Sequence, residues 1–487
     1  MAISLKTILV LILFPMIGHS QWEQLGFEIL GTEQYENIGK NISLNTDGNV
    51  FAVGSEEHNG LTQNNSGLCR VYQWSSNNWA VKGLAINGEV ANENFGYNMS
   101  INSDGNTVAA SSIEDLELDD NSSGCVKVYD YINGSWEQKG ETLRGLGTET
   151  NFGFDINLNA TGDRIAISSP LSDVVNTDAG MVQIYEWNGE TWQQMGLDLI
   201  GFSEGEHFGH SISMNNEGDR IAIGAPKSAI NGTNSGRALV YAWSENTWNV
   251  LGDQLIGLEP GAKTGNCVKI DEDCSILAVG SPGFNPNGLL SPNGTIKVYD
   301  WDFNENNWLQ KGNDIIGIEA EDKCGENFDL SGDGTTLCSG EHRHNFSLGA
   351  VRVLKWVNNE WSQQGNTITG NQLFDRCGKG VSINRQGTKM AIGIPYSITT
   401  NNRGKMEIYE NNSVGISELA ESEFNAFPNP SNGPVILNIP SNETWIIRNL
   451  MGEIIKTGKG TFCDLTNEPS GIYFVNCLGK TIKLIIC

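Results

Sequence analysis

Positive charge is scarce in this sequence. Its 487 residues include 58 aspartates and glutamates but only 30 lysines and arginines, which gives a formal net charge of −28 at pH 7. Nucleic acids and anionic lipid surfaces both require a cationic face, so the composition argues against either as a partner. The simplest interpretation is solubility outside the cell, and the alternative is a specific cationic partner.

Long apolar runs are missing from the body of the chain, so we do not expect a membrane-spanning protein. A short run does occur within residues 1–20, where Lys6 precedes the apolar stretch from Ile8 to Ile17. Gly18 and Ser20 then supply the small residues typical of a cleavage site, so a secretory signal peptide is predicted. Since the first cysteine of the chain is Cys69, an N-terminal lipid anchor on cysteine is not expected.

Two kinds of pattern are also absent. The ten cysteines do not have the regular spacing of a disulfide scaffold. We find no nucleophile with an adjacent base, no carboxylate pair and no phosphate-binding loop, and no cofactor is expected. An enzyme is therefore not indicated, although a ring of repeats can bring distant residues together.

The prominent feature that is present is a repeat. The skeleton W-x-x-x-G-x-x-(I/L)-x-G, then F-G, then I-A-I-G-x-P, then G-x-(V/L)-x-(V/I)-Y-x-W occurs seven times with variations. The opening tryptophans, spaced by 57, 57, 56, 56, 60 and 53 residues, are Trp22, Trp79, Trp136, Trp192, Trp248, Trp308 and Trp361. A period of this size indicates a stacked or radial array. One tryptophan at one position in every repeat is more typical of packing between sheets than of a sugar-binding platform.

Each repeat contains four predicted strands. In the fourth copy they cover Ser211–Met214, Arg220–Gly224 and Ala238–Trp243, followed by a strand that starts at Trp248. Gly218 supplies the positive φ that the first turn requires. We therefore expect an all-β fold, a seven-bladed β-propeller of four-stranded blades over residues 21–412.

The two ends of the repeat array are predicted to meet. The last apolar strand has no tryptophan strand after it, and the first tryptophan strand has no blade before it. Pairing of Trp22–Leu30 with Gly404–Tyr409 would close the ring and remove two exposed sheet edges.

The repeat resembles the FG-GAP repeat of integrin α-subunit propellers at Phe208-Gly209 and at Ala222–Pro226, and the seven-fold count agrees with that architecture. The phenylalanine is kept as Phe95, Phe152 and Phe208, whereas the other copies have Ile38, Thr264, Cys324 and Cys377. The calcium loops that this family builds from D-x-D-x-D-G are shortened here to four-residue turns. Calcium is therefore not expected.

Residues 424–487 form a separate predicted β-domain after an acidic linker at 413–423. The FPNPSNG segment at Phe427–Gly433, the IIRNLMGEIIKTG segment and the terminal GIYF strand resemble the C-terminal sorting domain of type IX secretion cargo in Bacteroidota. The resemblance implies that the type IX machinery is a partner and that the protein is secreted or held at the cell surface. An ordinary accessory β-domain is the alternative.

The predicted binding face is the rim that carries the F-G and G-x-P elements, because the longest loops also lie there. The candidate ligand residues on this rim are Glu56, His58, Asp115, His207, His210 and Arg343. Glu341, His342 and His344 are candidate metal ligands, with a solvated loop as the alternative. Since Cys324 and Cys377 replace phenylalanine in adjacent blades, they form either a cross-blade disulfide or two free buried thiols.

These features favour an exported protein that binds an extracellular protein or glycan through this rim. One alternative is a secreted hydrolase with its site at the mouth of the central channel. A structural or adhesive component of a surface layer is another.

Overall fold

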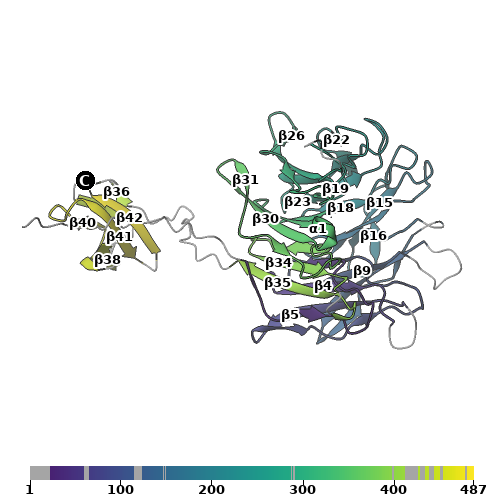
Figure 1. The fold of residues 1–487 in the computed structure, drawn as a ribbon, viewed down its shortest axis with the longest axis horizontal. Helices are drawn as coiled ribbons and strands as arrows, with labels where there is room; N and C mark the ends of the chain where they lie inside the picture. Colours follow the sequence, from purple (N-terminus) through teal and green to yellow (C-terminus); the bar gives the residue numbers. More distant parts are fainter. Residues whose placement is uncertain are drawn as a thin grey trace, which may run out of the picture. The chain divides into compact units, whose positions relative to one another are not determined.

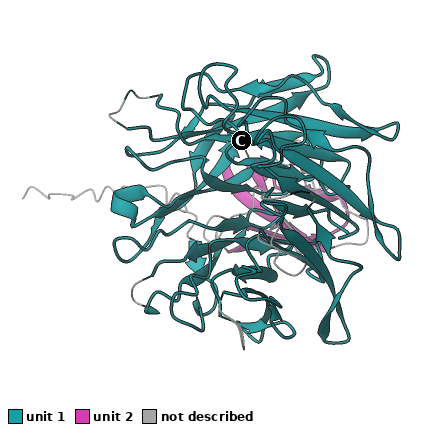
Figure 2. Cartoon of the chain, turned by 90° about the vertical axis from the view of Figure 1, so that its right-hand side faces the viewer, with its two compact units in different colours: residues 1–413 teal, residues 414–487 magenta. Residues whose placement is uncertain are grey.

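The computed structural model describes residues 22–59, 65–113, 123–145, 147, 150–286, 288, 291–397 and 400–411, and in the tail 426–427, 431, 434–437, 444–449, 453–477 and 480–486. The chain divides into two compact units, residues 1–413 and 414–487 (Figures 1 and 2). The predicted signal peptide at 1–20, the linker at 413–423 and Asp115 lie outside the described residues.

The first unit has a propeller-like all-β fold. Its described residues form seven antiparallel sheets. The first three are β3 (Ile42–Leu44), β4 (Val50–Ser55), β5 (Leu68–Ser75), β6 (Asn78–Val81) and β7 (Ile86–Asn87); β8 (Met99–Ile101), β9 (Thr107–Ser112), β10 (Cys125–Ile132), β11 (Ser135–Gln138) and β12 (Leu143–Arg144); and β13 (Ile156–Leu158), β14 (Arg164–Ser169), β15 (Met181–Trp187), β16 (Trp192–Gln194) and β17 (Leu199–Ile200).

The next three sheets follow the same order. They are β18 (Ser211–Met214), β19 (Arg220–Ala225), β20 (Arg237–Ser244), β21 (Thr247–Val250) and β22 (Leu255–Ile256); β23 (Val268–Ile270), β24 (Ile276–Ser281), β25 (Thr295–Asp302), β26 (Asn307–Gln310) and β27 (Ile315–Ile316); and β28 (Asn327–Leu330), β29 (Thr336–Glu341), β30 (Ala350–Val357), β31 (Glu360–Gln363) and β32 (Ile368–Thr369). A short helical turn, α1 (His344–Ser347), lies between β29 and β30.

The seventh sheet joins the two ends of the repeat array. It contains β33 (Val381–Ile383), β34 (Lys389–Ile394) and β35 (Lys405–Asn411), and β35 pairs with β1 (Trp22–Gln24) and β2 (Ile29–Leu30). Trp22 lies opposite Asn411 and Ile29 lies opposite Met406, which confirms the predicted closing pair. The first strands of the seven sheets contact one another in sequence order, and β33 contacts β3, so the sheets form a closed ring.

The outer strand of each sheet is broken into two pieces that pair with the same neighbour, so each sheet has five strands at the four predicted positions. The glycine of W-x-x-x-G lies at this break. Gly196 has φ +82° there, and a Cβ on it would lie 2.6 Å from Cζ3 of Trp243 in the next sheet. This close approach explains why the skeleton keeps glycine at that position.

The phenylalanine of F-G fills the space between two sheets. Phe208 forms a parallel bridge with Gly180 of the preceding sheet. Its side chain is 1% exposed and belongs to a core cluster with Val182 and Ile184 on one side and Ile221 and Ile223 on the other. Each F-G position therefore contributes to one inter-sheet core.

The tryptophans pack between sheets as predicted. The indole Nε1 of Trp248 donates a hydrogen bond of 2.9 Å to the carbonyl of Met195 in the preceding sheet. The same bond to the preceding sheet is made by Trp79, Trp136, Trp192, Trp308 and Trp361. Because both the ring and its polar atom are used in packing, this position is structural.

The second unit has two small sheets around one core. One contains β36 (Ala426–Phe427), β37 (Pro434–Leu437) and β40 (Phe462–Asp464); the other contains β39 (Ile454–Lys459), β38 (Thr444–Asn449), β41 (Gly471–Cys477) and β42 (Lys480–Ile486). Val435 and Cys463 from the first sheet share a cluster with Trp445 and Val475 from the second. The predicted GIYF strand lies within β41, whereas the two prolines of the FPNPSNG segment, Pro428 and Pro430, lie outside the described residues.

Within the described part of the chain, no helix has both the length and the hydropathy needed to cross a bilayer.

Candidate functional site

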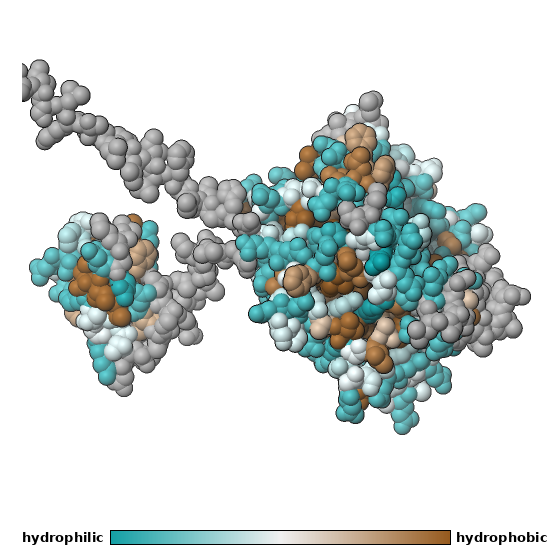
Figure 3. Space-filling view, turned by 60° about the horizontal axis from the view of Figure 1, so that its bottom comes forward, coloured by the Kyte–Doolittle hydropathy of each residue, from teal (hydrophilic) through white to brown (hydrophobic). Residues whose placement is uncertain are grey.

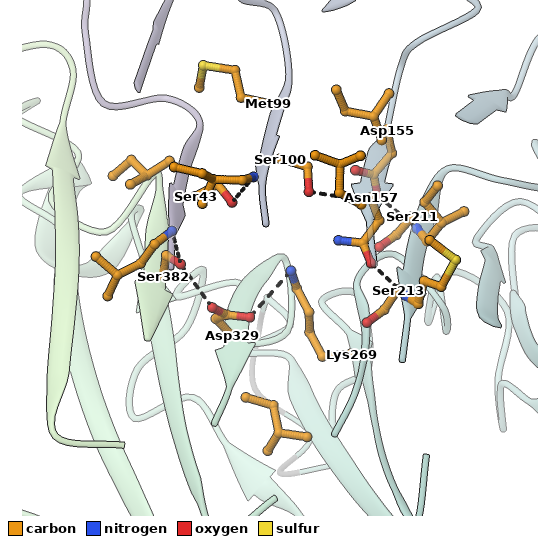
Figure 4. A pocket seen from close by; sticks show the side chains of 18 of the residues that line it. Ser43, Met99, Ser100, Asp155, Asn157, Ser211, Ser213, Lys269, Asp329 and Ser382 are labelled. Atoms are coloured by element: carbon orange, nitrogen blue, oxygen red, sulfur yellow. Dashed lines mark hydrogen bonds and ion pairs between the residues drawn. The ribbon is translucent and has the colours of Figure 1, made fainter. Parts of the chain in front are cut away.

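A cavity of about 560 Å³ runs along the first strands of the seven sheets (Figure 4). Short strands with alternating polar and apolar residues line it. Apolar side chains such as Met99 and Ile212 belong to the cores between sheets, while polar side chains such as Ser43 and Ser213 line the cavity. The cavity is therefore a polar channel through the ring.

The polar side chains midway along the channel connect neighbouring sheets. Each accepts a hydrogen bond from a backbone N–H of another sheet: Ser43 from Ile101 (3.0 Å), Ser100 from Leu158 (2.9 Å), Asn157 from Met214 (2.7 Å), Ser213 from Ile270 (3.1 Å), Asp329 from Ile383 (2.9 Å) and Ser382 from Leu44 (3.2 Å). These groups stabilise the ring, so they are poor candidates for ligand binding.

The remaining sheet, the fifth, has a lysine at the equivalent position. The side chain of Lys269 cannot accept a hydrogen bond, and its Nζ lies 3.4 Å from Oδ1 of Asp329 (Figure 4). Burial lowers the pKa of Lys269, but Asp329 and the other acidic groups nearby, Asp155 among them, together outweigh the burial and raise the pKa, so the ammonium stays charged. Asp155 also lines the channel, and burial raises its pKa to about 6 although Ile212 N–H donates to it at 2.8 Å.

At one end of the channel, the first side chain of each N-x-x-G turn is hydrogen-bonded to the backbone of the same turn. Oδ1 of Asn215 accepts hydrogen bonds from the N–H groups of Asp219 (3.0 Å) and Arg220 (2.9 Å). The equivalent residues Asn45, Asn102, Asn159, Asp271 and Asn384 do the same. One side-chain oxygen of each of these residues is thus already occupied by N–H donors of its own turn.

Backbone hydrogen bonds also link these turns around the ring. The N–H of Ser103 donates to Ala160 (3.0 Å), that of Ala160 to Asn216 (3.0 Å), that of Asn216 to Glu272 (3.1 Å) and that of Glu272 to Gly332 (3.1 Å). The turn end is therefore structural, and the opposite end is the candidate for recognition.

The opposite end is lined by the residue that directly follows F-G in each repeat. We call these residues the mouth ring: Lys40, Tyr97, Phe154, His210, Asn266, Glu326 and Lys379. All seven are half-buried. One arc is aromatic, since the ring centroids of Tyr97 and Phe154 are 5.8 Å apart and those of Phe154 and His210 are 5.1 Å apart. The other arc carries an amide, a carboxylate and two ammonium groups.

The tautomer of His210 follows from its partner. Its Nδ1 lies 3.1 Å from the backbone carbonyl of Asn266, which can only accept, so Nδ1 holds the proton. Burial lowers the pKa of His210 to about 4. The imidazole is therefore neutral at pH 7, with Nε2 as an acceptor.

A second cavity of about 310 Å³ adjoins the mouth ring, lined by residues of the third, fourth and fifth repeats. It shares Phe154, His210 and Asn266 with the mouth ring and adds His207, Lys227 and Lys263. Nζ of Lys227 lies 3.1 Å from Nε2 of His207. An ammonium can only donate, so His207 is the acceptor and is neutral, in agreement with a pKa lowered by burial and then by Lys227.

Two of the other predicted rim residues are engaged with neighbours. Glu56 pairs with Lys40 at 2.7 Å, and His58 lies 3.6 Å from Glu33. Arg343 lies at the start of α1 and is exposed. His207 and His210 are thus the predicted rim residues that the structure brings into one cavity.

The predicted metal ligands do not converge. Glu341 is buried against Arg352, Nε2 of His342 lies 3.6 Å from Glu326, and Nδ1 of His344 lies 2.9 Å from Asp322. The structure thus gives Glu341, His342 and His344 separate partners and does not bring them together as one ligand set. A different group, Glu319, Asp322 and His344, has its ligand atoms within 4.8 Å of one another.

Of the two alternatives for Cys324 and Cys377, the structure has the second: both cysteines are free and buried. Cys324 belongs to the core between the fifth and sixth sheets, and Cys377 to the core between the sixth and seventh. One sheet separates the two thiols. Packed sheets are about 10 Å apart, whereas a disulfide needs Cα atoms within about 7 Å.

Of the seven mouth-ring residues, the sequence analysis predicts one, His210. All seven share one position in the repeat, the residue directly after F-G. The residue type at this position changes from copy to copy, so a comparison of the repeats for shared residues does not select it.

A search of protein-family models finds no family that matches this chain, and a search of curated proteins finds no relative. Among solved structures, the chain is similar to a candidate 6-phosphogluconolactonase from Bacteroides uniformis, with 9% sequence identity, coverage of 69% of this chain and 87% of that one, and a TM-score of 0.46. The description of the first unit as propeller-like rests on its own strand pairing.

Proposed function

We propose that this chain is an exported seven-bladed β-propeller that binds an extracellular glycan at its channel mouth. The observation that carries the proposal is the division of the mouth ring into an aromatic arc and a polar arc. Sugar rings present C–H faces that pack on aromatic side chains, and their hydroxyl groups need donors and acceptors nearby. Tyr97 and Phe154 provide the first surface, and Asn266, Glu326 and Lys379 provide the second.

Support for a ring with seven blades comes from the seven sheets and their closing pair. Support for export comes from the apolar leader at 1–20 and from the tail at 424–487, which we propose is a type IX sorting domain. The tail's two-sheet unit with its own core is compatible with a module that is recognised separately.

The binding test uses the mature chain from Gln21 on a glycan array, with a protein array in parallel. Phe154→Ala and Tyr97→Ala should each lower glycan binding at least tenfold. Phe303→Ala is the matched control, because Phe303 is 84% exposed and does not line the channel. Glycan binding that survives both mouth substitutions, or binding confined to the protein array, would overturn the proposal.

A secreted hydrolase is the second candidate, and one observation favours it. Two carboxyl groups that line the same channel have pKa values shifted in opposite directions. Burial raises the pKa of Asp155 to about 6. Burial also acts on Glu326, but His342 and Lys379 offset it, and the pKa of Glu326 is lowered. Such divergence is typical of acid and base pairs. Turnover of a bound glycan that is lost in Asp155→Asn and Glu326→Gln would favour this candidate. Self-association of the mature chain at micromolar concentration would favour a structural or adhesive role instead.

A further inference from the structure

The small cavity beside the mouth ring has a charge opposite to that of the whole chain. The chain carries 58 acidic and 30 basic residues, yet the residues that line this cavity include Lys227, Lys263, His207 and His210 and no carboxylate. A pocket so different from the average surface points to a ligand that favours positive charge.

Lys227 and Lys263 carry the positive charge of this cavity. Among the residues that the structure describes, no carboxylate lies within ion-pair distance of Lys227 or Lys263, and both are exposed. Other lysines of the rim are paired with carboxylates. Lys40 lies 2.7 Å from Glu56, Lys323 lies 3.3 Å from Glu321 and Lys379 lies 3.5 Å from Glu326. The charge in this cavity is therefore available to a ligand.

The backbone of the repeat places two of these basic residues at the cavity. The residue before F-G has a positive φ in all seven repeats, and in the first three copies it is asparagine, the residue that tolerates this conformation best after glycine. The other four copies have basic residues there: His207 (φ +53°), Lys263 (φ +57°), Lys323 (φ +59°) and Arg376 (φ +54°). Of these four, His207 and Lys263 line this cavity.

The remaining lining supplies an apolar surface. Phe154, Pro170, Leu171 and Pro226 lie around the cavity, and Pro170 and Pro226 are buried. Neutral His207 already accepts from Lys227, which fixes that ammonium in place at 3.1 Å. The lining of the cavity thus combines apolar side chains with two ammonium groups.

We infer that this cavity binds the acidic group of a charged sugar unit, with the sugar ring against Phe154 and the anion between Lys227 and Lys263. The inference rests on the proposed glycan function and deepens it, because it assigns the ligand class. The ligand class that we assign is a sugar that bears a negatively charged group, either a carboxylate or a sulfate.

The test measures binding of the mature chain to three probes by calorimetry: galacturonic acid oligomers, the same oligomers as methyl esters, and a sulfated galactan. At least one acidic probe should bind tenfold more tightly than the neutral ester at low salt, and 0.5 M NaCl should remove most of the difference. Which acidic probe binds distinguishes carboxylate from sulfate.

Lys227→Met and Lys263→Met should together lower the affinity for the acidic probe at least tenfold and leave any binding of the ester unchanged. Lys355→Met is the matched control, since Lys355 is exposed and does not line the cavity. Equal affinity for acid and ester, or an acid affinity that survives both substitutions, would overturn the inference. If neutral glycans still bind and require Phe154, only this inference fails; if no glycan binds, the proposed function fails as well.

Discussion

Trp22 lies opposite Asn411 across an antiparallel pair, so the first described strand of the chain completes the last sheet of the ring. The contact continues at Ile29 and Leu30, which pair with Met406 and Lys405. Among the described residues of the first unit, this is the one sheet that contains strands from both ends of the repeat array. The pairing of β1 and β2 with β35 therefore closes the ring, together with the contact between β3 and β33.

Removal of this closing segment is expected to unfold the whole first unit. Deletion of residues 21–31 leaves the outer edge of β35 unpaired and the core around Val353 and Ile392 without Trp22. We expect loss of the cooperative transition, or a midpoint lowered by at least about 10 °C, in thermal unfolding followed by circular dichroism. Gln24→Ala, an exposed change in the same strand, should shift the midpoint by less than about 2 °C. An unchanged midpoint after the deletion would contradict the closing role.

A buried ion pair within the fourth repeat gives the second prediction. Nη2 of Arg237 lies 3.0 Å from Oε1 of Glu206, and both residues are almost fully buried. Glu206→Gln leaves the guanidinium without a counter-charge, so the free energy of unfolding should fall by about 3–5 kcal/mol. Urea denaturation measures the change. In the same repeat Arg220→Ala removes a largely exposed pair with Asp219, at 3.7 Å, and a long hydrogen bond of 3.5 Å to the carbonyl of Asp273, and should cost less than about 1 kcal/mol.

The equivalent pair in the first repeat should make stability depend on pH. Burial alone would raise the pKa of Glu36, but Arg70, 2.5 Å away, and the backbone N–H of Glu33 lower it below the ordinary value of 4.5. A carboxyl group with a lowered folded-state pKa stabilises the protein above its unfolded-state pKa, and this contribution is lost as the pH falls through the folded-state value. We therefore expect Glu36→Gln to be much less stable than the natural chain at pH 7, with the difference shrinking below about pH 4.5. A difference that is constant from pH 7 to pH 3 would argue against this origin.

The sequence predicts most of the first unit because each repeated residue has the same surroundings in every sheet. Gly196 and Trp248 are examples, since each meets the neighbouring sheet through the same contact that recurs around the ring. Even Cys274, which replaces the turn glycine in the fifth copy, adopts φ +54° as the repeat requires.

The candidate site is predicted less well, for a physical reason. His207 and His210 could be assigned to the binding rim, but their cavity also needs Lys227 and Lys263 from other segments, and only the curvature of the ring brings these together. Conversely, Glu341, His342 and His344 are neighbours in sequence and have separate partners in space. Adjacency along the chain is a poor guide to a site in a tight turn.

The turn asparagines should contribute to stability in each repeat. Asn215→Ala removes an acceptor for two backbone N–H groups, those of Asp219 and Arg220, at a buried position. We expect the free energy of unfolding to fall by about 1–3 kcal/mol in urea denaturation. Glu217→Ala, at an exposed side chain in the same turn, should change it by less than about 0.5 kcal/mol. Equal effects of the two substitutions would show that the asparagine side chain does not support the turn.

The thiols of Cys324 and Cys377 should be unreactive in the folded protein and free once it unfolds. Burial raises the pKa of Cys324 to about 12 and also raises that of Cys377, so neither forms the reactive thiolate near pH 8. Iodoacetamide should leave both unmodified in native conditions and alkylate both in denaturant without a reductant, as read by peptide mass spectrometry. A peptide pair linked through these two cysteines would instead require the sheet between their cores to move, since Cys324 contacts Ile315 and Ser339 while Cys377 packs with Ile392.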